Sequence, residues 1–296
     1  MADSFLRKWF GGPRAAAPAV EEVRAELDRL AAARPALLPL VAWLREILPD
    51  LTPLTGPMPV PSLEPERART KLEGGIPLLR GERLVVDAAA FRQRWRRACA
   101  ALEAQQADGA AVALADAVQH GRLDPAAMVD AVVAGQPEVV RQQAEVLGLD
   151  PGLATTLLRF TLFPLCTALE ESLGPFRAGI AWERGYCPTC GSWPLLGEFR
   201  GLDQSRFLRC CLCASGWEVP RLWCPFCGNR DHELLGFLHS EGEEAKYRAS
   251  VCDGCRGYVK MVSTLSALPP LHLLVADAAT LHLDLAAAER GYTGQC

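Results

Sequence analysis

The chain has 296 residues, half of them hydrophobic, and a formal net charge of −4 at pH 7. This length predicts about two domains and is ample for a sizeable hydrophobic core. The negative net charge speaks against a protein that attracts nucleic acid through an overall basic surface.

The N-terminal stretch MADSFLRKWFGG contains basic side chains but no uninterrupted apolar run, so we expect no secretory signal peptide. No stretch of about 18 uncharged apolar residues occurs, and we therefore expect no stable insertion into a membrane. These features predict a cytoplasmic protein. In that reducing compartment, many cysteines indicate metal or redox chemistry rather than structural disulfides.

Residues 1–182 are predicted to form a helical domain. The segment AVEEVRAELDRLAAAR (19–34) is rich in Ala, Leu, Glu and Arg and places its apolar residues at helical spacing. The segment PDLTPLTGPMPVPSLEP (49–65) contains too many prolines to continue a helix. We expect an extended linker there.

Further helices are expected before residue 182. Asp87 and Asp124 are predicted N-caps, and Pro125 then occupies a first-turn position. The segment LATTLLRFTLFPLCTALEESL (153–173) is the most apolar helical segment in the chain.

Beyond residue 182 the composition changes. Nine of the twelve cysteines lie between residues 187 and 255, and ten of the 21 aromatic residues lie between 183 and 265. Short β-prone runs such as SRFLRCCLC, GWEVPRLWC, AKYRASVC and GYVKMVSTL predict small β-ribbons around metal-binding turns. The tail, residues 268–296, is expected to form a strand followed by a helix. The fold class predicted for the whole chain is therefore α+β.

The cysteines form four Cys-x-x-Cys pairs. This spacing lets two sulfurs point inward from one tight turn, and proline after the first cysteine, where present, presets that turn. Glycine after the second cysteine, at Gly191 and Gly228, allows a positive φ. The candidate metal ligands are Cys187, Cys190, Cys210, Cys213, Cys224, Cys227, Cys252 and Cys255.

An internal repeat indicates how these pairs combine. Both YCPTCGSWPLLG and WCPFCGNRDHELLG place a Leu-Leu-Gly strand after the cysteine pair. The repeat predicts two tandem modules, residues 183–222 and 223–267, each with one four-sulfur site built from its own two pairs. Interleaved pairing between the modules is an alternative that fits the repeat less well.

A four-cysteine cage takes zinc or iron, and the spacing does not separate the two. Such a cage has no open coordination position, so its role is structural or electron-transferring rather than hydrolytic. The competing interpretations are disulfides, inert buried thiols, or one thioredoxin-like redox pair, which four pairs on ribbons do not suit.

Other candidate residues receive simpler interpretations. Cys211 lies between two predicted ligands and is expected to point away from the site, while Cys99 and Cys166 are expected to be small core residues. His232 and His239 are expected at the surface. Exposed tryptophans could anchor a partner, although at least two of Trp193, Trp217 and Trp223 are expected to be buried.

The motifs CPTCGSWP, RCCLC, LWCPFCG and SVCDGCRGYVKM, with the tail VADAATLHLDLAAAERGY, resemble the formate dehydrogenase accessory proteins of the FdhE family. The resemblance covers residues 183–292, and the N-terminal half agrees only in length and helical character. It implies a cytoplasmic, non-enzymatic maturation factor that contacts the catalytic subunit of a respiratory formate dehydrogenase before export. It also implies that the eight cysteines hold iron in two mononuclear rubredoxin-like sites, with zinc as the alternative.

Two other functions compete with this one. A nucleic-acid-binding zinc ribbon is opposed by the charges of residues 183–265, where ten Lys or Arg are balanced by ten Asp or Glu. An electron-transfer enzyme is opposed by the absence of a flavin or nicotinamide sequence fingerprint. One-electron chemistry at an iron site that serves assembly remains a hypothesis.

Overall fold

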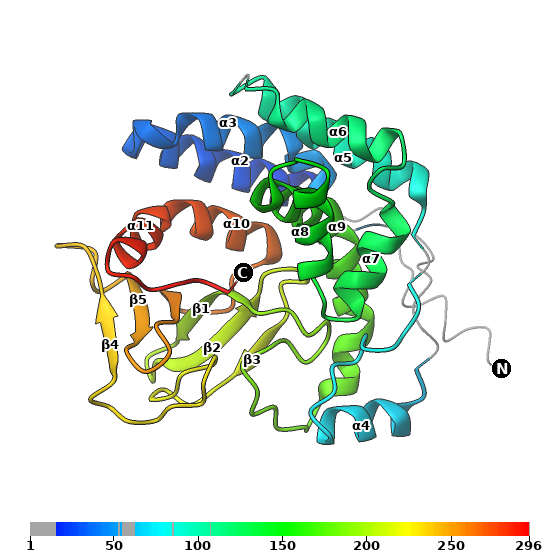
Figure 1. Ribbon diagram of the computed structural model, residues 1–296. Helices are drawn as coiled ribbons and strands as arrows, with labels where there is room; N and C mark the ends of the chain where they lie inside the picture. Colours follow the sequence, from blue (N-terminus) through cyan, green and yellow to red (C-terminus); the bar gives the residue numbers. More distant parts are fainter. Residues whose placement is uncertain (1–15, 53, 55–62, 85, 107, 296) are drawn as a thin grey trace.

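The computed structural model describes residues 16–52, 54, 63–84, 86–106 and 108–295. From Ala16 to Arg177 the described residues form helices joined by turns and loops (Figure 1). The α-helices of this half are α2 (Ala16–Ala33), α3 (Leu38–Ile47), α4 (Pro65–Glu73), α5 (Ala88–Glu103), α6 (Ala110–Gln119), α7 (Pro125–Val133), α8 (Glu138–Val146) and α9 (Pro151–Leu173).

The predicted helix starts are confirmed. Asp87 accepts hydrogen bonds from the backbone N–H groups of Ala89 and Ala90, and Asp124 accepts one from Ala127. These contacts satisfy N–H groups that a helix start leaves without an intrahelical partner. Residues 53 and 55–62 of the expected linker lie outside the described residues, as does the N-terminal stretch 1–15. The described ends of the linker are not extended as expected, since Leu48–Leu51 form a 3-10 helix and α4 begins at Pro65.

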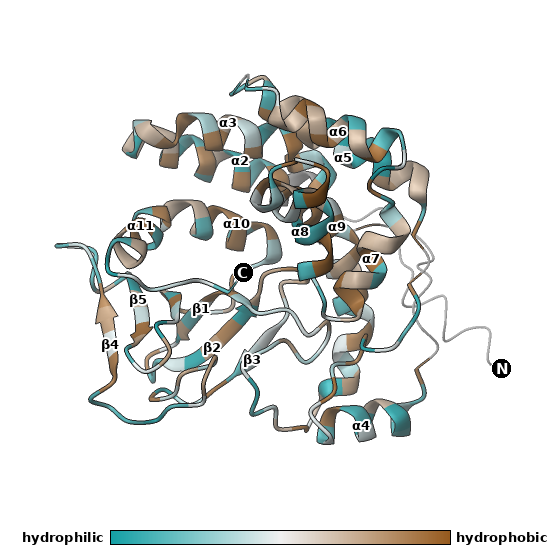
Figure 2. Cartoon of the chain, in the orientation of Figure 1, coloured by the Kyte–Doolittle hydropathy of each residue, from teal (hydrophilic) through white to brown (hydrophobic). Residues whose placement is uncertain are grey.

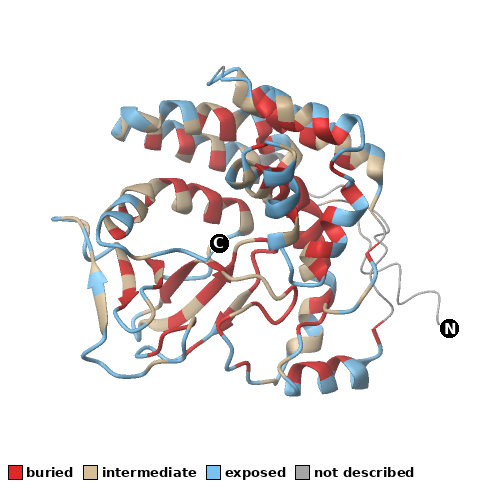
Figure 3. Ribbon diagram, in the orientation of Figure 1, coloured by how far each residue is buried: buried red, intermediate tan, exposed pale blue. Residues whose placement is uncertain are grey.

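Helix α9 is the central helix of this half. Its hydrophobic segments, brown in Figure 2, coincide with the buried segments, red in Figure 3. The segment Pro151–Arg177 is long and apolar enough to cross a membrane, but 67% of its most apolar window is buried inside the protein. This burial is typical of a core helix.

The second half contains one six-stranded sheet. Its strands are β1 (Pro194–Arg200), β2 (Ser205–Cys210), β3 (Gly216–Glu218), β4 (Leu235–Leu238), β5 (Tyr247–Cys252) and β6 (Tyr258–Thr264), in the order β3-β2-β1-β6-β5-β4. Each expected β-prone run therefore contains a strand. The strands of each half of the sheet are antiparallel to their neighbours, and β1 joins β6 in parallel. This parallel pairing fuses the two ribbons into one sheet.

The tail differs from the sequence prediction. The expected strand is a helix, α10 (Pro270–Ala279), and it is followed by α11 (Leu281–Glu289). The run LHLLV is β-prone, but Pro270 occupies a first-turn position, and Leu271, Leu274 and Ala278 share one buried helix face. Packing of that face outweighs the local β propensity. Helices α10 and α11 lie between the sheet and α2 and α3 (Figure 1).

A buried ion cluster attaches these helices to the sheet. Lys260 Nζ on β6 lies 2.6 Å from a carboxylate oxygen of Asp277 and 2.6 Å from one of Asp284. The Lys260 side chain is 4% exposed, so an unpaired ammonium there would cost several kcal/mol, about 3 to 5. The two carboxylates satisfy it and fix α10 and α11 over β6.

Candidate metal centres

All four Cys-x-x-Cys segments form the same kind of turn. In three of them a backbone N–H after the second cysteine donates to the carbonyl of the first: Gly191 to Cys187, Gly228 to Cys224, and Arg256 to Cys252. The expected positive φ is confirmed, at 83° for Gly191 and 74° for Gly228. The other two turns place Ala214 (57°) and Arg256 (59°) in the same left-handed region, where the sequence offered no glycine to indicate it.

The structure brings the eight candidate cysteines together as two groups of four. Within each group all Sγ atoms lie within 4.8 Å of one another. Cluster one contains Cys187, Cys190, Cys210 and Cys213, and cluster two contains Cys224, Cys227, Cys252 and Cys255. Each cluster therefore combines the two cysteine pairs of one module, as the repeat predicted.

The sulfur geometry suits a metal ion. In cluster one the Sγ atoms are 3.3 Å apart for Cys190 and Cys210 and 3.5 Å apart for Cys187 and Cys213. In cluster two the Sγ atoms are 3.7 Å apart for Cys227 and Cys252 and 3.6 Å apart for Cys224 and Cys255. A tetrahedron with metal–sulfur bonds of about 2.3 Å has edges of about 3.8 Å, whereas a disulfide bond is about 2.05 Å long. All eleven described cysteines are free thiols, which rules out the disulfide interpretation for them.

Cluster one lies inside the main hydrophobic core. Its four cysteines are between 0 and 3% exposed, and apolar side chains such as Leu79, Val133 and Leu212 surround it. Backbone N–H groups of Thr189 and Leu212 donate to Cys187 Sγ and Cys210 Sγ, both at 3.4 Å. Burial raises the pKa values of Cys210 and Cys213, so an ion must displace thiol protons when it binds.

Two elements of the helical half hold the first turn of cluster one. The N–H groups of Leu78 and Leu79 donate to the carbonyls of Pro188 and Thr189, at 2.9 and 2.8 Å. The Thr189 hydroxyl donates to Glu170 of α9. Burial raises the pKa of Glu170 to about 7, against the opposing effect of Arg177.

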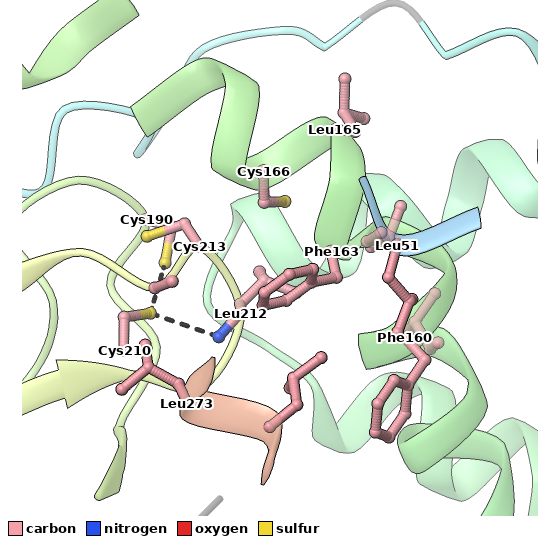
Figure 4. Close-up of a cluster of buried hydrophobic side chains, with 14 of the residues drawn as sticks. Leu51, Phe160, Phe163, Leu165, Cys166, Cys190, Cys210, Leu212, Cys213 and Leu273 are labelled. Carbon is pink, nitrogen blue, oxygen red and sulfur yellow. Dashed lines mark hydrogen bonds between the residues drawn. The ribbon is translucent and has the colours of Figure 1, made fainter. Parts of the chain in front are cut away.

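Helix α9 also places Cys166 beside cluster one. Cys166 and Cys190 line the same small cavity, and Figure 4 shows Cys166 on the side of cluster one where Cys190 and Cys213 lie. Cys166 is 3% exposed. Its pKa is raised mainly by burial and, to a smaller extent, by the negative charge of Cys190 and Cys187. A raised pKa keeps the thiol protonated, and Cys166 lies outside the four-sulfur group.

Cluster two lies nearer to the solvent. Cys224 and Cys252 are buried, but Cys255 is half-buried and Cys227 is exposed. Desolvation alone would raise the pKa of the Cys252 thiol. Hydrogen bonds from the backbone N–H groups of Cys255 and Gly254 oppose this effect and help to lower the pKa to about 7. A partly ionised thiol near neutral pH is well suited to bind a cation.

A buried arginine lies close to cluster two. Arg206 of β2 is 3% exposed, and its Nη1 donates to the carbonyls of Pro220, Arg221 and Trp223. Burial lowers its pKa to about 10, against the opposing effect of Cys224, so the guanidinium stays charged at neutral pH. Its charge partly offsets that of a four-thiolate cage.

Comparison with known proteins identifies the family. The family model described as "FdhE, C-terminal domain" matches residues 222–296. An FdhE homologue of Pseudomonas aeruginosa is 32% identical over 267 residues, which cover 86% of this chain and 80% of that protein. The chain belongs to the FdhE family.

Other FdhE proteins match over shorter stretches. The FdhE homologue of Stutzerimonas stutzeri is 40% identical over 116 residues, covering 38% of this chain and 37% of that protein. The Escherichia coli O127:H6 FdhE protein is 35% identical over 127 residues, covering 40% and 38%. The crystal structure of the P. aeruginosa FdhE protein superposes with a TM-score of 0.57 at 27% identity, covering 92% of each chain. The fold of this chain is therefore the FdhE fold.

The remaining candidate residues lie where the sequence predicted. Cys99 and Cys166 are buried in α5 and α9, and Cys211 lies outside cluster one. His232 and His239 are exposed. Trp217 and Trp223 are buried, while Trp193 is partly buried against Tyr186 and Phe226. Cys296 lies outside the described residues.

Sequence reasoning missed the residues that support the clusters. Leu78, Leu79 and Glu170 come from the helical half, more than 15 residues before the first cysteine turn, and no local motif connects them to it. Arg206 stands in an ordinary strand pattern. Only tertiary packing assigns these residues to the metal centres.

Proposed function

We propose that this chain is an accessory factor for the maturation of a respiratory formate dehydrogenase and is not itself an enzyme. It binds the catalytic subunit in the cytoplasm before export. The observation that carries this proposal is the pair of four-cysteine clusters on the FdhE-family fold. The family resemblance supplies the client, and the clusters supply a rigid scaffold on which the client docks.

The proposed ligands of the two ions are the eight cysteines of clusters one and two. Iron is the proposed metal in both clusters, on the family resemblance, and zinc is the alternative that the same donor set accepts. A bound iron ion would supply one-electron chemistry, and either metal would cross-link the turns. The N–H groups of Thr189 and Leu212 at cluster one support thiolate binding because they donate to sulfur.

The proposed division of the chain follows the sequence. Residues 1–182 form the helical part, and residues 183–222 and 223–267 carry one metal site each. Residues 268–296 form a tail whose helices pack on one face of the sheet.

The proposal is tested in a strain that lacks this gene but retains its formate dehydrogenase. Restoring the chain is expected to restore formate-dependent dye reduction, and tagged chain is expected to co-purify with the catalytic subunit. A double variant, Cys224→Ser with Cys227→Ser, is expected to lose one ion and to restore little activity. Full activity from a variant that has lost the ion would contradict a role for cluster two.

The metal is identified in the same anaerobic eluate. Two iron ions with a high-spin ferric signal that dithionite removes would support iron. Two zinc ions in a colourless protein would assign the scaffold to zinc and would remove the one-electron role.

A further inference from the structure

Strand β4 forms an open edge of the sheet. Among the residues that the structure describes, it pairs only with β5. Its four residues, Leu235–Leu238, include no charged residue and no proline, and Phe237 is 48% exposed. Figure 2 colours this strand as hydrophobic, and Figure 3 shows it partly exposed. Native proteins usually protect such an edge with charge, proline or a covering element.

The backbone of β4 has hydrogen-bonding groups that face outward. Asp253 N–H donates to the Leu234 carbonyl across the ladder, whereas Cys252 N–H donates away from β4, to the Gly257 carbonyl. Leu235 and Cys252 therefore form a non-bonded pair. Hydrogen-bonded and non-bonded pairs alternate along an antiparallel ladder. With the register Leu235 to Cys252 and Phe237 to Ser250, the N–H and C=O groups of Leu235 and Phe237 point away from β5.

The pairing of β1 with β6 shows that the equivalent strand edge in the first module binds a parallel strand. Each module is a three-stranded meander, and the modules follow each other as β3-β2-β1 and β6-β5-β4. The outer edge of β1, the first strand of its module, is covered by the parallel strand β6. Strand β4 is the first strand of the second module, so its open edge corresponds to the edge of β1 that β6 covers.

The face of the sheet beside β4 carries arginines without acidic partners. Arg248 of β5 lies next to Ala249, which pairs with Lys260, so Arg248 is on the face opposite to α10 and α11. Its guanidinium lies 5.4 Å from the ring centre of Phe237 and 5.2 Å from that of Phe199. Arg221 lies 5.8 Å from the ring centre of the same Phe199 and donates to the Asp203 carbonyl. Among the described residues neither arginine forms an ion pair with a carboxylate, and Arg248 Nε is buried without a hydrogen bond.

A mostly apolar groove runs beside β4, and its lining includes Phe237 as well as Cys224 and Cys252 of cluster two. It has a volume of about 40 Å³ and is lined by Leu222, Trp223, Phe237, Ser250 and Cys252, among others. Leu222 is 58% exposed. The groove can accept an apolar side chain from a segment that lies along β4, and Arg248 can pair with a carboxylate on the same face.

We propose that the edge of β4 binds an extended segment of a partner protein, which adds to the sheet parallel to β4. The segment bonds to the outward N–H and C=O groups of Leu235 and Phe237. It places an apolar side chain in the groove by Leu222 and a carboxylate beside Arg248. The inference rests on the proposed function, since the partner is the catalytic subunit of the formate dehydrogenase.

The test compares two substitutions at one position. Phe237→Ala removes the ring and keeps the outward N–H, whereas Phe237→Pro removes both, and proline is tolerated where a strand N–H faces solvent. Binding of the purified catalytic subunit to the full-length, metal-loaded chain is measured by biolayer interferometry. Phe237→Pro is expected to bind about five- to tenfold more weakly than Phe237→Ala.

A second pair of variants protects the test against misfolding of the proline variant. Arg248→Glu and Arg29→Glu change the net charge equally, but Arg29 is exposed on α2, and α10 and α11 lie between α2 and the sheet (Figure 1). Arg248→Glu is expected to bind the subunit at least about tenfold more weakly than Arg29→Glu, with both ions retained.

The outcomes separate the two proposals. Binding that is equal within both pairs of variants would overturn the role of the β4 edge and leave the maturation function standing. A wild-type chain that does not bind the subunit would overturn both. A dimer of this chain that forms without the subunit and is lost in Phe237→Pro would assign the edge to a second copy and overturn the proposed occupant.

Discussion

The hydroxyl of Thr189, in the turn between Cys187 and Cys190, donates a hydrogen bond to the carboxylate of Glu170 on α9. Thr189 is fully buried, and its carbonyl accepts from Leu79 N–H. The first metal-binding turn is thus held by a helix and a loop of the helical half. An ion at cluster one would therefore stabilise the packing of the helices on the sheet, whereas cluster two lies outside the main core.

The first prediction concerns the different roles of the two clusters. Cys190→Ser is expected to lose one of the two ions and to increase hydrogen exchange in α9 and in residues 74–84. The local opening free energy should fall by about 2 kcal/mol or more, because buried polar groups lose partners. The measurement is hydrogen exchange by mass spectrometry with metal analysis of the same sample.

Cys227→Ser is the matched control, since Cys227 occupies the corresponding position in the third turn. It is expected to lose one ion as well, but its increased exchange should stay within residues 223–267. Equal exchange in α9 for both variants would contradict the coupling of cluster one to the helices.

The second prediction is an order of metal loss. The sulfurs of cluster one are at most 3% exposed, whereas Cys227 is exposed and Cys255 is half-buried. A chelator reaches cluster two directly but reaches cluster one only after local opening. Every 1.4 kcal/mol of local opening free energy slows the release of the ion from cluster one by about tenfold. Metal release is therefore expected in two well-separated kinetic phases of one ion each, a fast one from cluster two and a slow one from cluster one.

The order is checked with a coloured chelator added to protein that carries two zinc ions. A Cys227→Ser and Cys255→Ser double variant should lack the fast phase and keep the slow one. Loss of the slow phase instead would reverse the assignment.

The third prediction concerns pH. Burial alone would raise the pKa of Asp277, but Lys260 and Arg159 outweigh it and hold this pKa below its usual value. Burial alone would lower the pKa of Lys260, but Asp277 and Asp284 raise it. The Asp277 contribution is lost as pH falls through its folded pKa, and the Lys260 contribution is lost as pH rises through its own, so both are present from about pH 4 to 10.

Asp277→Asn is expected to destabilise the protein by about 1 to 3 kcal/mol at pH 7, because Lys260 loses one of its two carboxylate partners. The difference in unfolding free energy between wild type and Asp277→Asn should shrink as the pH falls below about 4, because Asp277 of the wild type then becomes protonated. Urea unfolding at pH 7 and at lower pH measures both values. A difference that stays constant over this range would show that the charge of Asp277 is not responsible.

The sequence predicted the local features of this protein well. The Cys-x-x-Cys spacing and the Leu-Leu-Gly repeat are contained in short segments, and so are the caps at Asp87 and Asp124. Each depends on a few neighbouring residues, and therefore composition and spacing were sufficient to place them. The grouping of the cysteines followed because each cluster uses one repeat.

Long-range pairing could not be predicted in the same way. The parallel contact of β1 with β6 joins residues more than 60 positions apart, and no pattern in either strand specifies a partner. The β-prone run at the start of α10 became helical because its apolar face packs on the sheet and on α2. The contact of residues 77–80 with the first turn was missed for the same reason.

The last prediction tests that contact with a pair of glycines. Gly191 and Gly228 occupy the same place in two turns and have φ values of 83° and 74°. A Cβ at Gly191 would lie 2.7 Å from Arg80 Nη2 and 3.1 Å from Pro77 Cγ, whereas at Gly228 the nearest atom, Trp223 Nε1, is 3.9 Å away. Alanine in the left-handed region costs about 1 kcal/mol at either position. Gly191→Ala should cost about 1 kcal/mol more, because the Arg80 side chain can turn away but the Pro77 ring must shift. Both variants are expected to keep two ions, and chemical denaturation of the metal-loaded proteins measures the difference. Equal losses of stability would mean that the 77–80 loop accommodates the added methyl group without cost.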